Sequence, residues 1–132
     1  MNGTTERNGP PAVEPAIRAV PMPADANQNG DIFGGWVLSQ MDIAGGLVAA
    51  RQAQGRVATV AITAMTFHQP VLVGDEVSFY GVVTKVGRTS IAVKIESWAR
   101  RLTGEHTKVT EGLFTYVAIG TDRRPRPVPQ IR

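Results

Sequence analysis

The sequence predicts an α+β fold, in which one antiparallel sheet of five to six strands wraps around a single long, buried helix. Residues 34–54 are apolar nearly all round a helix, which is typical of a helix buried on most sides. After Gly55 the pattern changes to alternating apolar residues, in segments that are separated mostly by glycine-containing turns. Short turns of this kind join neighbouring antiparallel strands, so we expect a sheet built mainly of hairpins.

The chain before the helix is expected to contribute one short strand over residues 16–22, which Pro21 and Pro23 end. The helix is expected to begin at Gly34 or Gly35 and to reach about Gln54, with Gly55 as its C-cap. Several small residues within it would let strands pack closely against its surface: Ala44, Gly45, Gly46, Ala49 and Ala50.

The remaining strands are expected over residues 57–67, 76–86, 90–101 and 107–119. In the last of these, the alternation predicts one shared apolar face made of Val109, Leu113, Val117 and Ile119. A single sheet around one helix leaves its other face and its edges to be covered, so the sequence favours a homodimer.

The domain organisation follows from composition. Residues 1–15 are polar and rich in glycine and proline, which predicts a disordered segment. Residues 16–120 form the folded domain, and residues 121–132 form a basic, proline-rich tail. The tail holds much of the net charge of +3 but no aromatic residue, and this argues against nucleic-acid binding.

Composition also narrows the chemistry. The chain has no cysteine and only two histidines, His68 and His106, so thiol catalysis is excluded and a metal site is not expected. No segment approaches the length of a membrane span or carries a signal-peptide core, which favours a cytoplasmic protein without membrane contact.

The stretch NQNGDIFGGWVLSQMD, from Asn27 to Asp42, carries the strongest chemical pattern. Asn27 is a turn-forming residue, and Gly34 and Gly35 lie where the helix begins and leaves backbone N–H groups free. Asp42 is one acid within an apolar helix, where burial is costly unless the carboxylate is paired or used. This combination is suited to polarising a carbonyl group and activating water.

Three runs, NGDIFGGWVLSQMD, VATVAITAMTFHQPVLVGDEV and VGRTSIAVKIESWAR, closely resemble the YciA-type bacterial acyl-CoA thioesterases, which have the hotdog fold. The resemblance covers about Ala19 to Ile119. It implies a hydrolase of lipid metabolism that cleaves acyl-CoA thioesters to free acid and coenzyme A without a metal or cofactor. It also implies a homodimer that often assembles further into a trimer of dimers, a hexamer.

The resemblance implies that Asp42 is the catalytic carboxylate, either as general base or as nucleophile. Asn27 either caps its loop or lines the site. Related enzymes polarise the thioester with a glycine eight residues before the acid, which here is Gly34. Eight helical residues span about 12 Å, so we expect Asp42 of one subunit to act with Gly34 of the other.

Arg88, Thr89 and Ser90 form a hairpin turn, and such residues contact coenzyme A in related enzymes. They are therefore candidate ligands of its phosphates, with Arg56 as a weaker one; an exposed turn without ligand is the alternative. Two other functions are possible on this fold: an enoyl-thioester hydratase, which needs a close Asp and His pair that this sequence does not contain, and a binding domain without catalysis, which often lacks the acid that is present here as Asp42. His68 is expected to be structural or to line the interface, since no GxSxG motif accompanies it.

Overall fold

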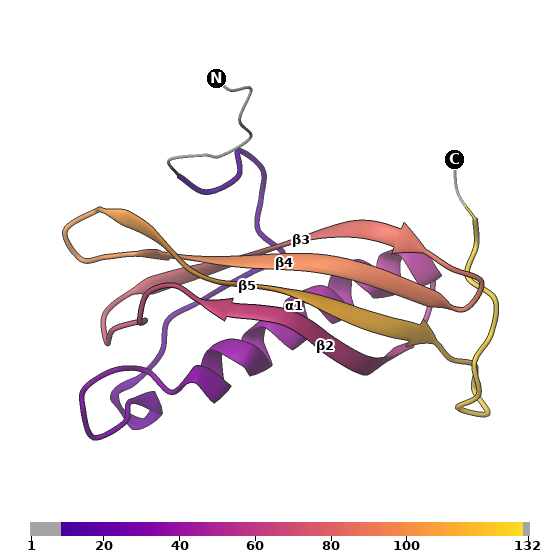
Figure 1. Ribbon diagram of the computed structural model, residues 1–132, viewed down its shortest axis with the longest axis horizontal. Helices are drawn as coiled ribbons and strands as arrows, with labels where there is room; N and C mark the ends of the chain where they lie inside the picture. Colours follow the sequence, from indigo (N-terminus) through magenta and orange to yellow (C-terminus); the bar gives the residue numbers. More distant parts are fainter. Residues whose placement is uncertain (1–8, 131–132) are drawn as a thin grey trace.

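A computed structural model describes residues 9–130 and contains one five-stranded antiparallel sheet and one long α-helix. The elements are β1 (Ile17–Ala19), a 3₁₀ turn (Pro23–Asp25), α1 (Gly34–Ala53), β2 (Val57–Phe67), β3 (Glu76–Val86), β4 (Ser90–Arg100) and β5 (His106–Ala118). The strands follow the order β1-β3-β4-β5-β2, and α1 lies along the inner face of the sheet (Figure 1). This confirms the predicted architecture, with five strands.

The helix is buried because its apolar residues are distributed around most of its circumference. Met41, Ala44 and Ala49 are fully buried against the inner face of the sheet, where Phe79 and Ile95 also lie. The helix ends one residue before the expected position. Gln54, and not Gly55, adopts the left-handed conformation of the cap, with φ of 54°. A Cβ atom at Gly55 would meet the end of the Arg126 side chain, which would have to shift to make room.

The predicted apolar face of the last strand was wrong over most of its length. Opposite Ser97 and Trp98, β5 contains one extra residue, since these pair with Thr110 and Lys108. Val109 is buried, but this β-bulge reverses the alternation after it, because side-chain direction alternates at every residue. Leu113 and Val117 therefore face outwards, and the buried residues beyond the bulge are Thr110, Gly112, Phe114, Tyr116 and Ala118.

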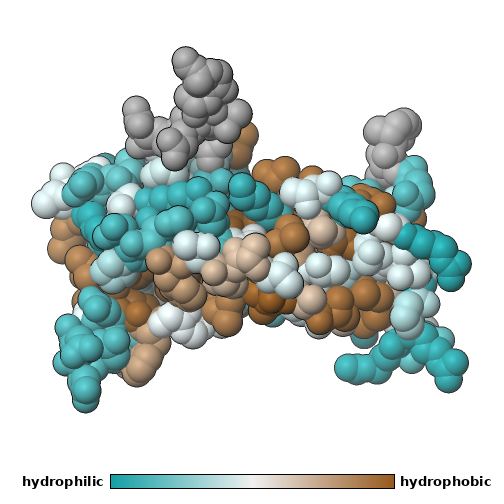
Figure 2. Space-filling view, viewed as in Figure 1, coloured by the Kyte–Doolittle hydropathy of each residue, from teal (hydrophilic) through white to brown (hydrophobic). Residues whose placement is uncertain are grey.

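Among the described residues 9–130, the long edge strand β2 pairs only with β5, and it is mostly exposed. It bears the exposed apolar residues Val60 and Phe67, which are 57% and 55% exposed. Figure 2 shows brown and white residues along the margin of the molecule where β2 runs, whereas teal residues gather elsewhere. Its pairing with β5 contains two irregularities, and Ala64, at the second, has φ of 51°.

The first described residues of the chain contain no regular secondary structure. Residues 9–15 form neither helix nor strand, and residues 1–8 of the predicted disordered segment lie outside the described residues. Within residues 9–130, no helix is long and apolar enough to cross a membrane.

Gly45 marks the closest approach of α1 to the sheet. A Cβ atom there would overlap the Tyr116 hydroxyl and the Ile95 side chain, whereas one at Gly46 would lie 3.8 Å from the Tyr116 ring. We expect Gly45→Ala to lower the free energy of unfolding by about 1–3 kcal/mol through overpacking. The matched control, Gly46→Ala, should be neutral or raise it by up to about 1 kcal/mol through helix propensity. Denaturant unfolding at one protein concentration measures both, and equal effects would contradict this account.

Candidate active site

The carboxylate of Asp42 is held by two hydroxyl groups from the sheet. The Thr59 hydroxyl donates to Asp42 Oδ1 at 2.7 Å from β2, the open edge strand. The Tyr116 hydroxyl, from β5, lies 3.0 Å from the Asp42 main-chain oxygen and 3.1 Å from Oδ1. Asp42 is half-buried and is the only acid in α1. The helix therefore presents a fixed carboxylate oxygen beside the strand that lacks a neighbour.

Burial raises the pKa of the Tyr116 hydroxyl above its ordinary value of 10.0, and the nearby Asp42 carboxylate raises it further. Tyr116 therefore stays protonated at neutral pH and remains a hydrogen-bond donor. A donor is what an ionised carboxylate requires, since it can only accept.

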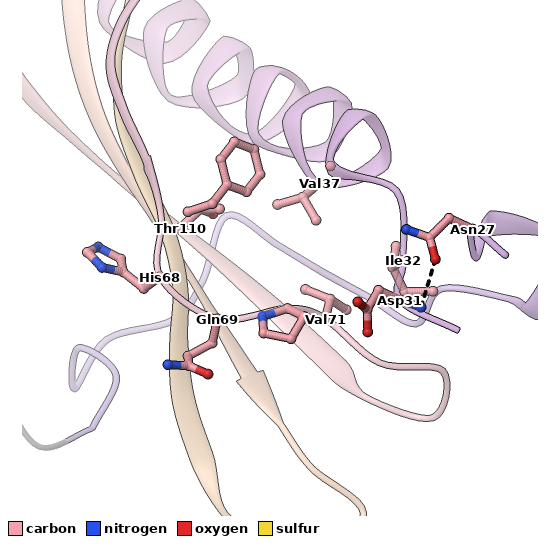
Figure 3. Close-up of a pocket in the computed structure, with 11 residues that line it drawn as sticks. Asn27, Asp31, Ile32, Val37, His68, Gln69, Val71 and Thr110 are labelled. Atoms are coloured by element: carbon pink, nitrogen blue, oxygen red, sulfur yellow. Dashed lines mark hydrogen bonds between the residues drawn. The ribbon is translucent and has the colours of Figure 1, made fainter. Parts of the chain in front are cut away.

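The start of α1 opens into a separate pocket of about 320 Å³. It lies between the 27–32 loop, the first turn of the helix and the chain that follows β2 (Figure 3). Ile32, Val37 and Val71 give it apolar walls, while Asn27 and Thr110 add polar groups. Gly34 lines this pocket and Asp42 does not.

The first turn of the helix has no side-chain cap. Phe33 occupies the N-cap position, where serine or aspartate would normally accept a hydrogen bond from the helix. Within residues 9–130, the amides of Gly34 and Gly35 donate no hydrogen bond, whereas the amides of Trp36 and Val37 donate to the Phe33 oxygen. Gly34 therefore offers a free N–H group to the pocket, together with the positive end of the helix dipole. Gly35 is exposed and does not line the pocket.

Asn27 both organises its loop and lines the pocket. Its side-chain oxygen accepts hydrogen bonds from the amides of Asn29 at 2.8 Å and Asp31 at 3.1 Å. This is the expected Asx-type turn, and it brings the Asn27 side chain to the pocket wall (Figure 3). The two alternatives considered for Asn27 are thus compatible, and a role in chemistry stays a prediction.

The predicted coenzyme A residues lie at the opposite end of α1. Arg88 and Thr89 occupy the turn between β3 and β4, and Ser90 begins β4. Arg56 follows the helix, and its main-chain oxygen accepts a hydrogen bond from the Ile119 amide. Within one chain, these residues are separated from Gly34 by the length of a 20-residue helix, about 30 Å.

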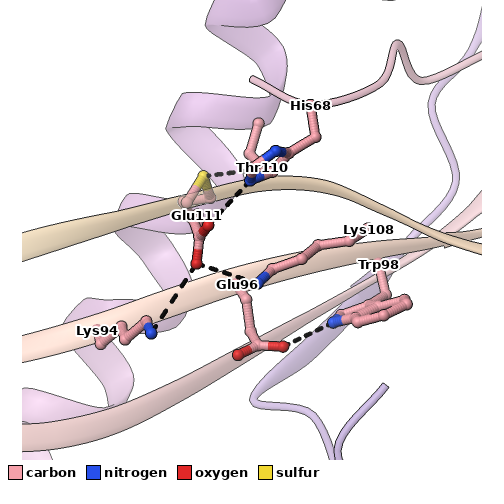
Figure 4. Close-up of polar contacts among 8 residues, drawn as sticks. His68, Lys94, Glu96, Trp98, Lys108, Thr110 and Glu111 are labelled. Atoms are coloured by element: carbon pink, nitrogen blue, oxygen red, sulfur yellow. Dashed lines mark hydrogen bonds and ion pairs between the residues drawn. The ribbon is translucent and has the colours of Figure 1, made fainter. Parts of the chain in front are cut away.

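His68 points away from Val37 in Figure 3, and its Nε2 atom lies 2.9 Å from Glu111 Oε2 on the outer face of the sheet. Glu111 also accepts a hydrogen bond from Lys108 at 3.0 Å and lies 3.9 Å from Lys94 (Figure 4). His68 therefore belongs to an ion-pair cluster, and it also lines the pocket beside Gly34. Within residues 9–130, no group of three or more His, Cys, Asp or Glu residues could hold a metal ion.

Thr59, Tyr116 and Thr110 were not singled out from the sequence. Thr59 and Tyr116 are 17 and 74 residues from Asp42, so only the fold brings them to it. No local signal in the sequence pointed to Tyr116, because the predicted apolar face of the last strand placed its side chain outwards.

Comparison with known proteins matches residues 29–104 to the family model of the thioesterase superfamily. The chain belongs to this superfamily. It is 48% identical to the acyl-CoA thioester hydrolase YciA of Salmonella typhimurium, over 95% of this chain and 97% of that protein. It is 55% identical to an uncharacterised acyl-CoA thioester hydrolase of Zymomonas mobilis, over 90% and 80%.

Solved structures agree with the sequence relatives. A hexameric thioesterase from Yersinia pestis has a TM-score of 0.87 and 48% identity, covering 92% of this chain and 99% of that one. A hexameric hotdog-fold thioesterase of Campylobacter jejuni has a TM-score of 0.85 and 40% identity, covering 89% and 91%. The predicted YciA-type family and the hotdog fold of this thioesterase-superfamily member are confirmed.

The Glu111 cluster predicts a pH dependence of stability. The hydrogen bonds from Lys108 and then His68 lower the pKa of Glu111 below its ordinary value of 4.5. A lowered pKa contributes stability above the unfolded value, and this contribution is lost as the pH falls through the folded value. The free energy of unfolding of wild type should therefore exceed that of Glu111→Gln at pH 6, and the difference should shrink below pH 4.5. Glu105→Gln, in an exposed turn, is the control; a difference that stays constant with pH would contradict the prediction.

Proposed function

We propose that this protein hydrolyses acyl-CoA thioesters to free carboxylic acids and coenzyme A, with Asp42 as the catalytic carboxylate. The observation that carries this proposal is the position of Asp42 in the helix. It is the only acid of α1, and hydroxyl groups fix it beside an unpaired strand edge. The substrate class is supported by the similar bacterial proteins that are named acyl-CoA thioester hydrolases.

The chemistry requires water, one carboxylate and one N–H donor. Acting as general base, Asp42 removes a proton from water while the water oxygen attacks the thioester carbon. The carbonyl oxygen becomes an oxyanion, which the Gly34 amide and the helix dipole stabilise. When the carbon–sulfur bond breaks, the thiolate of coenzyme A takes the proton. Alternatively, an Asp42 carboxylate oxygen attacks the carbon and displaces the coenzyme A thiolate, and water then hydrolyses the mixed anhydride to the free acid and the Asp42 carboxylate. Neither route uses a metal or cofactor.

Two copies complete the site in this proposal. Gly34 lies against Phe67, at one end of β2, whereas Asp42 is bonded to Thr59, near the other end. If two β2 edges pair antiparallel, the Phe67 end of one strand lies beside the Thr59 end of its partner. Gly34 of one subunit then faces Asp42 of the other. The exposed apolar residues of β2 support such a homodimer, and the hexameric relatives support a trimer of dimers.

The same antiparallel pairing would also bring the predicted coenzyme A residues close to the Gly34 pocket. It brings the Arg56 and Arg88 end of one subunit towards the Gly34 pocket of the other, so a single extended ligand could contact both. We propose that Arg88, Thr89, Ser90 and Arg56 bind its phosphates, and that the pocket beside Gly34 takes the acyl group. A cytoplasmic location stays a prediction from the sequence.

Asp42→Asn should lower kcat by about 1,000-fold, because the amide can neither accept the proton nor form an anhydride. A thiol reagent measures released coenzyme A without background, since the protein has no cysteine. Glu105→Gln, an exposed acid, should keep full activity. The variant must show the wild-type oligomeric state by size exclusion. An Asp42→Asn protein that keeps more than a tenth of the wild-type rate would refute its role.

A mixed-subunit experiment tests the shared site. Gly34→Pro removes the donor N–H at the first helical position, where proline is tolerated, and Phe33 already has the extended φ and ψ of −55° and 136° that precede proline. Each homo-oligomer, Gly34→Pro or Asp42→Asn, should be nearly inactive. Co-expressed chains should regain about a quarter of the wild-type rate, because half the dimers are mixed and each mixed dimer has one intact site.

The control for this experiment is a mixture of the two purified homo-oligomers under conditions where subunits do not exchange, which should remain inactive. If the co-expressed sample is equally inactive, Asp42 and Gly34 act within one chain and the shared site is wrong.

A further inference from the structure

The basic, proline-rich tail is bound along one end of the domain. Residues 125–130, here called the strap, begin with a bridge between Pro125 and Ile119 and a hydrogen bond from the Arg126 amide to the Ala118 oxygen. Val128 is 3% exposed and belongs to the hydrophobic core. In Figure 1 the strap, in yellow, crosses the end of the molecule where α1 finishes and β3 turns into β4. A solvated tail would show none of these contacts.

The strap bonds directly to the turn that carries Arg88. The Val128 amide donates to the Arg88 oxygen at 2.8 Å, and the Gln130 side chain donates to the Gly87 oxygen at 3.1 Å. The Ala118 amide donates to the Thr89 oxygen at 2.9 Å. Three consecutive carbonyl groups of the turn are therefore directed into the protein.

The strap also reaches the segment that carries Arg56. The Arg126 guanidinium donates to the Ala53 oxygen at 2.9 Å, which satisfies one carbonyl at the end of α1, and to the Ile119 oxygen at 3.1 Å. It lies so close to Gly55 that a side chain there would overlap it. Both predicted coenzyme A segments thus share one fixed support.

Fixing the carbonyl groups also fixes the amides. In a trans peptide the N–H and C=O groups point in opposite directions, so carbonyls directed towards the strap turn the Arg88 and Thr89 amides away from it. Neither amide donates a hydrogen bond to any group of residues 9–130. Two adjacent free N–H groups beside an arginine side chain supply the donors and the positive charge that a phosphate group binds.

We infer that the strap positions the β3–β4 turn for the phosphate groups of the coenzyme A nucleotide, with Val128 and Gln130 as positioning residues that do not touch the substrate. This inference deepens the proposed function and rests on it for the identity of the ligand. The strap holds the main chain of the turn, and the turn binds the phosphates.

Two variants test the strap in the full-length protein. Gln130→Met keeps the side-chain length but removes both donated hydrogen bonds, and Val128→Ala loosens the buried anchor. Each should raise KM for an acyl-CoA about five-fold, in line with the loss of one hydrogen bond, and leave kcat within two-fold. The same acyl group on pantetheine, which lacks the nucleotide phosphates, should show unchanged kinetics. The Kd of free coenzyme A, by calorimetry, should weaken as much as KM. Glu105→Gln, at an exposed residue of the β4–β5 turn, is the control and should leave KM, kcat and Kd unchanged.

Equal losses on acyl-CoA and acyl-pantetheine would show a general structural effect and overturn the inference, as would unchanged kinetics in both variants. A wild-type protein that hydrolyses neither substrate contradicts the proposed function instead. In that case the coenzyme A Kd decides: weaker binding by the variants supports the strap, and unchanged or undetectable binding overturns it.

Discussion

The close approach of α1 to β5 at Gly45 is the contact on which the site depends. The absence of a side chain at Gly45 makes room for the Tyr116 hydroxyl, which bonds to both the main chain and the carboxylate of Asp42. The same tyrosine is 1% exposed and part of the hydrophobic core. Tyr116 therefore couples the packing of the core to the orientation of the Asp42 carboxylate. A change in helix position would disturb both.

The fold was predictable to the extent that it depends on local patterns. Helix α1 and strands β2 to β5 follow from periodicity, and β2 and β3 have the expected bounds. The inward face of β5 was not predictable, because the bulge at Val109 arises from its pairing with β4 and leaves no mark in the sequence. The sequence predicted only a basic tail where the strap lies. Its contacts were not predictable, because its hydrogen bonds join residues that are far apart in the chain, such as Val128 and Arg88.

Some residues of the candidate site were also predictable from local sequence, whereas others were not. Asp42, Gly34 and Asn27 could be singled out because an acid in an apolar helix and a loop of turn residues are unusual in themselves. Their relative placement could be argued from helix length alone, and the structure agrees that the Gly34 pocket excludes Asp42. Thr59 and Tyr116 have no such local signature; each becomes relevant only through its contact with Asp42.

The irregular backbone of β2 has a consequence for solubility. A long, flat and apolar strand edge is a template for open-ended association, in which unrelated strands add in any register. β2 is not such an edge, because it is interrupted at two places and Ala64 takes a left-handed conformation that a regular strand does not contain. A regular foreign strand could match only short stretches of it, whereas a second copy of β2 presents the same irregularities in reverse order. The irregular backbone of β2 therefore opposes open-ended association at an edge whose exposed apolar residues would otherwise favour it.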